Sequence, residues 1–168
     1  MIASSALRCL TWAAWREAAT PAACAMAACS DNGLVEPNPI KLLQEIWPAL
    51  NLDRGIVGVI GDDFIEAGIL LRIDRLFYSD RDMLLERCLF VRPEFRKSGE
   101  TKIRRARSLC EFAKQAADRL SLPLVIGILT KERVEGKIRL YEKEFGEPAG
   151  AYWIYEPVKN EGAGALTK

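Results

Sequence analysis

The sequence contains no histidine, and this absence limits the chemistry open to the protein. Catalytic Ser-His and Cys-His pairs need an imidazole base, and many zinc sites use one as a ligand. The five cysteines include no pair with the Cys-x-x-Cys spacing of a zinc knuckle or a thioredoxin-type motif, so we predict no metal site. Cys88 and Cys110 fall in apolar-patterned segments, which predicts buried free thiols and a reducing, cytoplasmic location.

Long apolar runs are also missing. No stretch reaches the roughly 18 uncharged apolar residues that a membrane-spanning helix needs. Arg16, Glu17 and Pro21 interrupt the Ala-rich stretch near the start of the sequence, so we do not expect a signal peptide. The net charge is only +1, so no general field attracts nucleic acid or an anionic membrane, and we predict neither as a partner.

The residues that are present have the balance of one globular domain. The 168 residues are 28% charged and 49% hydrophobic, enough to bury a core. Their pattern predicts a helix at 11–29, interrupted near Pro21, and a second helix that begins at Pro39 after an Asn38 cap and ends near residue 50. Three apolar segments then predict an antiparallel meander of strands at 55–62, 64–78 and 82–91.

The second half of the sequence predicts a β-α-β unit. A helix follows Gly99, because apolar residues recur there at helical spacing and form one stripe. The stripe consists of Ile103, Ala106, Cys110, Ala113, Ala117 and Leu120. The apolar segment 122–130 predicts a parallel strand buried on both faces. A helix at 132–145 and a closing strand at 151–156 complete a single α/β domain, a central mixed sheet with helices on both faces.

The turn between the third strand and the helix after Gly99 is basic. It consists of Arg96, Lys97, Ser98, Gly99, Glu100 and Thr101, followed by Lys102, Arg104, Arg105 and Arg107. Backbone N–H groups at a helix start have no intrahelical partner and lie at the positive end of the dipole, so this turn is a candidate pyrophosphate site. The alternative is a solvated basic helix face. Neither a Gly-x-Gly-x-x-Gly dinucleotide motif nor a P-loop occurs.

Three segments carry a resemblance to a known family. They are LERCLFVRPEFRKSG at the end of the meander, the crossover helix, and RLYEKEFGEPAGAYWIYE further on. In this order they resemble the GCN5-related N-acetyltransferases, and among these the small acetyltransferase-like proteins encoded by bacteriophages and prophages. The resemblance covers residues 55–157. It implies one domain at 1–157, with a helical part at 1–50 and a cofactor-binding core at 55–157, and a flexible tail at 158–168.

The resemblance implies a role for each residue that matches. The backbone of Val91 would contact the pantetheine arm of acetyl-coenzyme A, and the basic turn would bind the pyrophosphate. The residues of that turn are Arg96, Lys97, Ser98, Gly99, Glu100 and Thr101. Glu86 would act as general base and Tyr141 as general acid in a direct acetyl transfer to an amine acceptor. The acceptor is not indicated, and a monomer and a homodimer both stay open.

The match has departures that leave a second interpretation open. Thr101 stands where the family has Gly or Ala, and Glu100 places a negative charge beside the phosphate site. The segment 134–137 replaces the family's Asn-x-x-Ala motif. The alternative is therefore an inactive binding or assembly module with the same fold, related to phage proteins.

Several candidate residues also have a purely structural interpretation. Tyr141 lies on the apolar stripe of its helix and would then be a core residue, and Glu86 would pair with Arg87 or another basic residue. Five aromatic residues either line an apolar acceptor cleft or belong to the core: Trp12, Trp15, Trp47, Phe77 and Tyr78.

Overall fold

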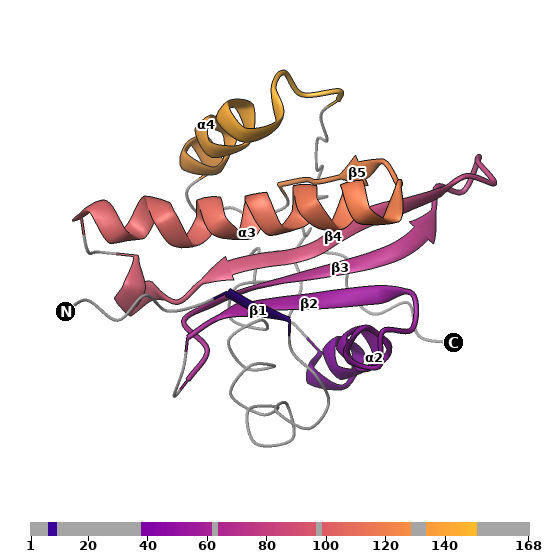
Figure 1. The fold of residues 1–168 in the computed structure, drawn as a ribbon, viewed down its shortest axis with the longest axis horizontal. Coiled ribbons are helices and arrows are strands. Elements are labelled where there is room, and N and C mark those ends of the chain that lie inside the picture. Colours follow the sequence, from indigo (N-terminus) through magenta and orange to yellow (C-terminus); the bar gives the residue numbers. More distant parts are fainter. Residues whose placement is uncertain (1–6, 10–37, 62–63, 97–98, 129–133, 151–168) are drawn as a thin grey trace, which may run out of the picture.

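A computed structural model describes residues 7–9, 38–61, 64–96, 99–128 and 134–150 (Figure 1). The predicted helix at 11–29, the closing strand at 151–156 and the tail at 158–168 lie outside the described residues. Trp12 and Trp15 lie outside them as well, and so do Lys97 and Ser98 of the basic turn.

The elements follow the predicted order. They are β1 (Leu7–Cys9), α2 (Pro39–Leu50), β2 (Gly55–Ile60), β3 (Ala67–Arg75), β4 (Asp82–Val91), the 3-10 turn η1 (Pro93–Phe95), α3 (Gly99–Leu120), β5 (Leu124–Val125) and α4 (Val134–Phe145). The short strand β1 is not predicted from the sequence, because three residues are too few for a periodic pattern. None of the helices in the described part of the chain is long and apolar enough to cross a membrane.

The sheet has the strand order β1-β2-β3-β4-β5. Strands β1 to β4 are antiparallel neighbours, whereas β4 and β5 are parallel and are joined through α3. This arrangement confirms the predicted meander and the β-α-β crossover. The chain is therefore an α/β domain built on a mixed sheet.

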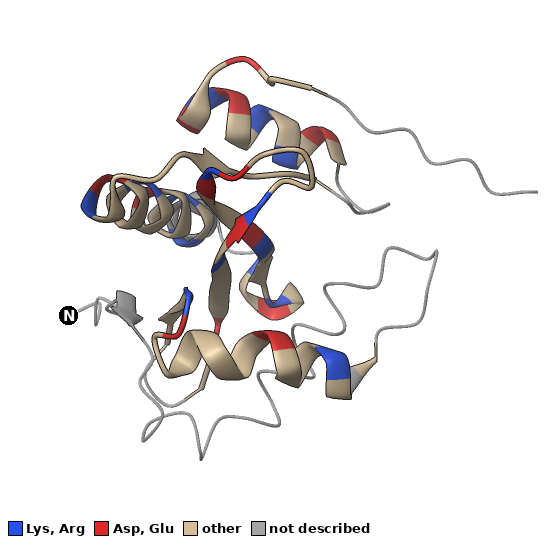
Figure 2. Cartoon of the chain, turned by 90° about the vertical axis from the view of Figure 1, so that its right-hand side faces the viewer, with Lys and Arg blue, Asp and Glu red and all other residues tan. Residues whose placement is uncertain are grey.

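Helices cover both faces of the sheet, and each face has its own core (Figure 2). On one face α2 contributes Ile46, Ala49 and Leu50, which pack with side chains of β2 to β4. On the other face α3 contributes Leu109, Cys110, Ala113, Ala116 and Ala117, and α4 lies over α3. The predicted burial of Cys88 and Cys110 is confirmed, and so is the middle of the α3 stripe. Leu120, at the end of that stripe, is exposed.

The start of α2 confirms the predicted cap. Asn38 Oδ1 accepts hydrogen bonds from the backbone N–H groups of Ile40 at 3.0 Å and Lys41 at 3.3 Å. Pro39 occupies the first turn, where its missing N–H costs no hydrogen bond. The local sequence thus fixes where this helix begins.

Strand β5 differs from its prediction. Among the described residues 122–128, only Leu124 and Val125 form strand, and Val125 is 40% exposed, so this part of the segment is not buried on both faces. Within the described residues β5 pairs with β4 alone, and the pairing stops after the partners Leu85 and Val125. The apolar run at 122–130 has the hydrophobic pattern of a buried strand, but burial on both faces also needs side chains packed against each face, and Val125 stays exposed.

Candidate functional site

Glu86 lies where β4 and β5 separate. The two strands pair at Leu84–Leu124 and Leu85–Val125, and β4 then continues to Val91 without further pairing to the described part of the β5 segment. The N–H of Gly127, just beyond β5, donates a hydrogen bond to Glu86 Oε2 at 3.4 Å. The Glu86 carboxylate therefore lies beside the segment that follows β5, just past the last β4–β5 pair.

The surroundings of Glu86 favour its neutral form. Burial raises the pKa of this carboxyl to about 7, although the N–H of Gly127 and the positive charge of Lys137 on α4 act in the opposite direction. Arg87 is not its partner. The Arg87 guanidinium instead contacts Asp74 at 2.7 Å and Glu45 at 3.7 Å. Glu86 is thus a sheltered carboxyl that changes its charge near neutral pH.

A β-bulge follows Glu86 directly on β4. Leu71 of β3 is opposite Glu86 and Leu70 is opposite Cys88, so Arg87 is the extra residue on β4. Before the bulge Leu84 belongs to the core under α3, and after it Cys88 belongs to the core under α2. Because side chains alternate along a strand, Glu86 shares the α3 face with Leu84, and the bulge reverses the alternation beyond it.

Tyr141 on α4 lies on the same face of the sheet. It is half-buried against the core under α3, and its ring packs edge-to-face on Phe145 with centroids 5.8 Å apart. Burial raises the pKa of the phenol, and the negative charge of Glu86 raises it further. The phenol is therefore protonated at neutral pH, and its proton lies within electrostatic reach of Glu86.

The basic turn lies at the other end of β4. Helix α3 begins at Gly99, and the backbone of Gly99, Glu100 and Thr101 forms its first turn. The Nε of Arg96 donates to the backbone carbonyl of Val91 at 2.5 Å, which ties this turn to the end of β4.

Two arginines of α3 form ion pairs with carboxylates that are distant in the sequence. Arg105 Nε pairs with Glu66 Oε2 at 2.6 Å, and both side chains are only 14% exposed. The Arg105 guanidinium also lies 5.0 Å from the Phe95 ring centroid, and its buried Nη1 has no hydrogen-bond partner among the described residues. Arg107 Nε pairs with Glu144 at 2.8 Å. These two carboxylates therefore offset the positive charges that the sequence places near the turn.

Several residues of this region are not predicted from the sequence. Gly127 and Lys137 shape the environment of Glu86, and Glu66 and Glu144 pair with the arginines of α3. Each meets its partner across the tertiary structure rather than along one element. The aromatic residues expected in a cleft or in the core are instead exposed where they are described: Trp47 on α2, and Phe77 and Tyr78 in the β3–β4 turn.

No protein-family model matches the chain, and no curated protein matches it in sequence. Its fold, by contrast, is similar to that of several solved structures. One is AAC(6')-Iy in complex with the bisubstrate analogue CoA-S-monomethyl-acetylneamine, with a TM-score of 0.58 and 14% identity over 90% of this chain and 97% of the other. Another is the ribosomal-protein-alanine N-acetyltransferase of Brucella melitensis biovar Abortus 2308, with a TM-score of 0.59 and 13% identity over the same shares.

A third similar structure is the aminoglycoside acetyltransferase HMB0005 from an uncultured soil metagenomic sample. Its TM-score is 0.58 and its identity 15%, over 90% of this chain and 97% of the other. In each of these comparisons the structural match covers nearly the whole of both chains. The protein therefore has the α/β fold of these acetyltransferases.

Proposed function

We propose that the protein is an N-acetyltransferase that transfers an acetyl group directly from acetyl-coenzyme A to an amine acceptor. The observation that carries the proposal is Glu86, a sheltered carboxyl with a pKa of about 7 at the point where β4 and β5 separate. An amine of the lysine type has a pKa near 10.4 and is protonated at neutral pH, so it must lose a proton before it can attack. A base whose pKa lies near the working pH is best matched to that task.

The chain offers suitable groups to acetyl-coenzyme A. Beyond Leu85, the edge of β4 that leaves β5 has backbone N–H and carbonyl groups for the amides of a pantetheine arm. The first turn of α3 has N–H groups without intrahelical partners, suited to a pyrophosphate. We assign the pantetheine contact to Val91 and the pyrophosphate contact to the basic turn, which consists of Arg96, Lys97, Ser98, Gly99, Glu100 and Thr101.

Two residues of the chain handle protons in this proposal. When bound, acetyl-coenzyme A supplies an acetyl group already activated as a thioester. Glu86 in its ionised form accepts the proton that the acceptor ammonium releases, directly or through a water molecule. Tyr141 keeps its proton at neutral pH. It donates this proton to the sulfur that leaves and regains one from the acceptor nitrogen, which loses its second proton as the amide forms. No residue of the chain is acylated, in keeping with a sequence that lacks histidine.

The acceptor is an amine of a class still to be chosen by experiment. AAC(6')-Iy was solved with a CoA-derived analogue of acetylneamine, and a second similar protein is an aminoglycoside acetyltransferase. A third acts, by its name, on a ribosomal-protein alanine. Aminoglycosides and peptides with a free N-terminus are therefore the first acceptors to test. The proposal includes a cytoplasmic location, which suits the buried free thiols of Cys88 and Cys110.

Calorimetric titration with acetyl-coenzyme A tests the proposal first. The wild type is expected to bind, and the Gly99→Glu variant to bind much more weakly, because a second carboxylate would face the phosphates beside Glu100. Ile40→Ser on α2 is a matched control that should bind like the wild type. A thiol-release assay with a panel of aminoglycosides, amino acids and peptides then tests turnover. No heat and no thermal shift at saturating cofactor would exclude both the site and the function.

The second candidate is a binding or assembly module of the same fold without catalysis, related to phage proteins. The pairing of Arg105 and Arg107 with carboxylates favours it, because these arginines add no charge for a phosphate. The packing of Tyr141 on Phe145 does so too, since a core tyrosine needs no catalytic role. This candidate replaces the first if the wild type binds acetyl-coenzyme A but acetylates nothing in the panel.

A further inference from the structure

The turn between β3 and β4 exposes aromatic side chains that folding does not explain. We call residues 76–81 the hairpin tip, and it projects beyond the end of the sheet (Figure 1). Phe77 is 100% exposed and Tyr78 is 71% exposed, and their rings pack edge-to-face with centroids 4.9 Å apart. A phenylalanine left wholly in water forgoes the gain of burying its ring, so this surface suits an interaction partner.

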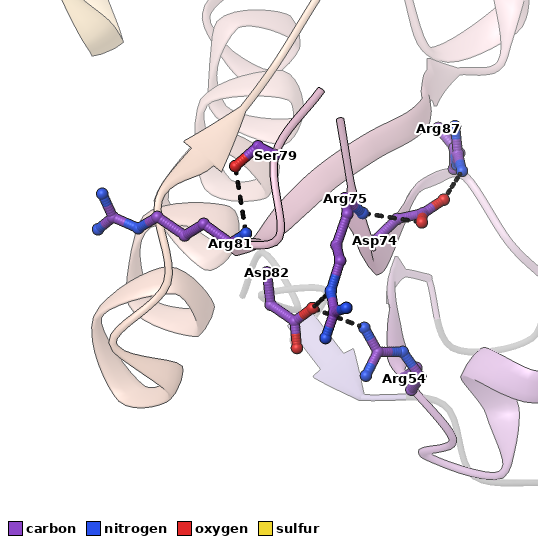
Figure 3. Close-up of polar contacts among 7 residues, drawn as sticks. All are labelled: Arg54, Asp74, Arg75, Ser79, Arg81, Asp82 and Arg87. Carbon is purple, nitrogen blue, oxygen red and sulfur yellow. Dashed lines mark hydrogen bonds and ion pairs between the residues drawn. The ribbon is translucent and has the colours of Figure 1, made fainter. Parts of the chain in front are cut away.

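The base of the hairpin holds the tip in one arrangement (Figure 3). Asp82 Oδ1 on β4 accepts from Arg75 Nε on β3 at 2.6 Å and from Arg54 Nη2 at 3.1 Å. Within the tip, the N–H of Ser79 donates to the carbonyl of Leu76 at 2.9 Å, and Ser79 Oγ accepts from the N–H of Arg81 at 3.1 Å. An ordered tip loses less conformational entropy when it binds, which favours association.

Further apolar side chains lie at the same end of the sheet. Strand β2 begins there after Leu52, which is 66% exposed, and α3 ends there at Leu120, also exposed. Val125 of β5 is 40% exposed and pairs with Leu85 near the start of β4. An aromatic residue buries about 150–250 Å² and a standard interface about 800 Å² per partner, so the two tip aromatics and these neighbours together approach what a specific interface needs.

The hairpin tip carries charges of both signs, which limits the kinds of partner that it complements. Asp80 and Arg81 are adjacent, exposed and opposite in sign, and neither side chain has a hydrogen-bond or ion-pair partner among the residues that the structure describes. A surface with both signs does not complement nucleic acid or an anionic membrane, which each carry one sign. Such a surface complements a second copy of itself. In a two-fold dimer, Asp80 of one copy can lie opposite Arg81 of the other, and Arg81 opposite Asp80.

We propose that this end of the molecule is a self-association surface, where two copies of the chain meet hairpin tip to hairpin tip. In this arrangement Phe77 and Tyr78 of each copy pack against the apolar residues at the sheet end of the other. Asp80 of one copy then faces Arg81 of the other, twice over. The inference does not depend on the proposed function, because the tip is separated from Glu86 by the first residues of β4.

Sedimentation equilibrium of the full chain tests the surface. The wild type is expected to form a concentration-dependent dimer. The double variant Phe77→Ser/Tyr78→Ser should weaken dimerisation at least about tenfold, because central aromatic residues dominate interface energetics. Ile40→Ser is the matched control, since Ile40 is 67% exposed at the start of α2, and it should leave the dimer unchanged. A wild type that stays monomeric at millimolar concentration would overturn the proposal, as would a dimer that the double variant does not weaken.

A charge exchange tests the two-fold pairing with variants that leave the core untouched. Asp80→Arg and Arg81→Asp should each weaken the dimer, because each places like charges opposite one another. The double variant Asp80→Arg/Arg81→Asp should restore it, and an equimolar mixture of the two single variants should form mixed dimers. If the double variant is as weak as the singles, the two-fold pairing is wrong. Binding of a monomeric wild type to phosphatidylserine vesicles would also overturn the proposal.

Discussion

Asp82 and Glu86 are carboxylates of the same strand, yet their surroundings act on them in opposite directions. Asp82 lies at the base of the hairpin, where hydrogen bonds first from Arg75 and then from Arg54 lower the pKa of its carboxyl. Glu86 lies where β4 and β5 separate, and burial raises its pKa to about 7. One carboxyl is therefore permanently charged at neutral pH, and the other gains and loses its proton there.

The difference shows what makes a carboxyl suitable for proton transfer. A charged partner fixes the ionised form and leaves the group unable to take up a proton near neutral pH. Desolvation without a charged partner in contact brings the pKa to the working range. In this protein the hairpin region has arginines that fix carboxylates, and the opening between β4 and β5 has a carboxyl that no arginine contacts among the described residues.

The largest effect is expected from removing the base. Glu86→Gln should lower the rate of acetyl transfer about 10²–10⁴-fold, the usual loss for a general base, with little change in affinity for acetyl-coenzyme A. Thiol release measures the rate and calorimetry the affinity. Asp82→Asn is the matched control on the same strand and should retain wild-type turnover. Equal turnover in Glu86→Gln and the wild type would show that Glu86 is not the base.

The second prediction concerns the pH dependence of stability. In the folded protein the pKa of Glu86 is about 7, whereas in the unfolded chain the carboxyl releases its proton near 4.5, the ordinary value of a glutamate. The contribution of protonated Glu86 to the free energy of unfolding is therefore fully present below about pH 4.5 and is lost as the pH rises through about 7. The loss amounts to up to about 3 kcal/mol, at roughly 1.4 kcal/mol per pKa unit. Urea unfolding of the wild type and Glu86→Gln at pH 5 and pH 8 measures it. The free energy of unfolding of Glu86→Gln, relative to that of the wild type, should be higher at pH 8 than at pH 5. The same difference at both pH values would contradict the raised pKa of Glu86.

The third prediction concerns Tyr141. Tyr141→Phe should fold normally, because the ring that packs on Phe145 is kept, and should release coenzyme A at least about tenfold more slowly, because only the proton source is lost. Cofactor affinity should change little. Thiol release and calorimetry again separate the two quantities. A variant with wild-type turnover would show that Tyr141 is a core residue alone.

The smallest effect is expected at the base of the hairpin. Asp82→Asn removes two solvent-accessible ion pairs, with Arg75 and Arg54, so the melting temperature should fall slightly at low ionic strength and match the wild type at high salt, where such pairs are screened. Because the pKa of Asp82 is lowered, any stabilisation is present above the pKa of the unfolded chain and is lost as the pH falls through the folded value. A loss that persists in high salt would mean that Asp82 does more than hold the hairpin.

The sequence by itself determined the elements whose signals are local. The Asn38 cap and Pro39 placed the start of α2, and the apolar stripe placed α3, because caps and helical periodicity act within a few residues. The strand, helix and strand in succession determined the parallel β4–β5 pair, since a parallel connection requires a crossover. The candidate residue Glu86 was also accessible from the sequence, through its position before Val91 in a recognisable segment.

Only the tertiary structure decided what surrounds these residues. The bulge at Arg87 appears only when β4 is aligned with β3, and it places Glu86 and Cys88 on opposite faces of the sheet. The N–H that contacts Glu86 comes from Gly127, 41 residues away, and the partner of Arg105 is Glu66, 39 residues away. The physical reason is that desolvation and ion pairing depend on which groups are neighbours in space, whereas periodicity and capping depend on neighbours along the chain.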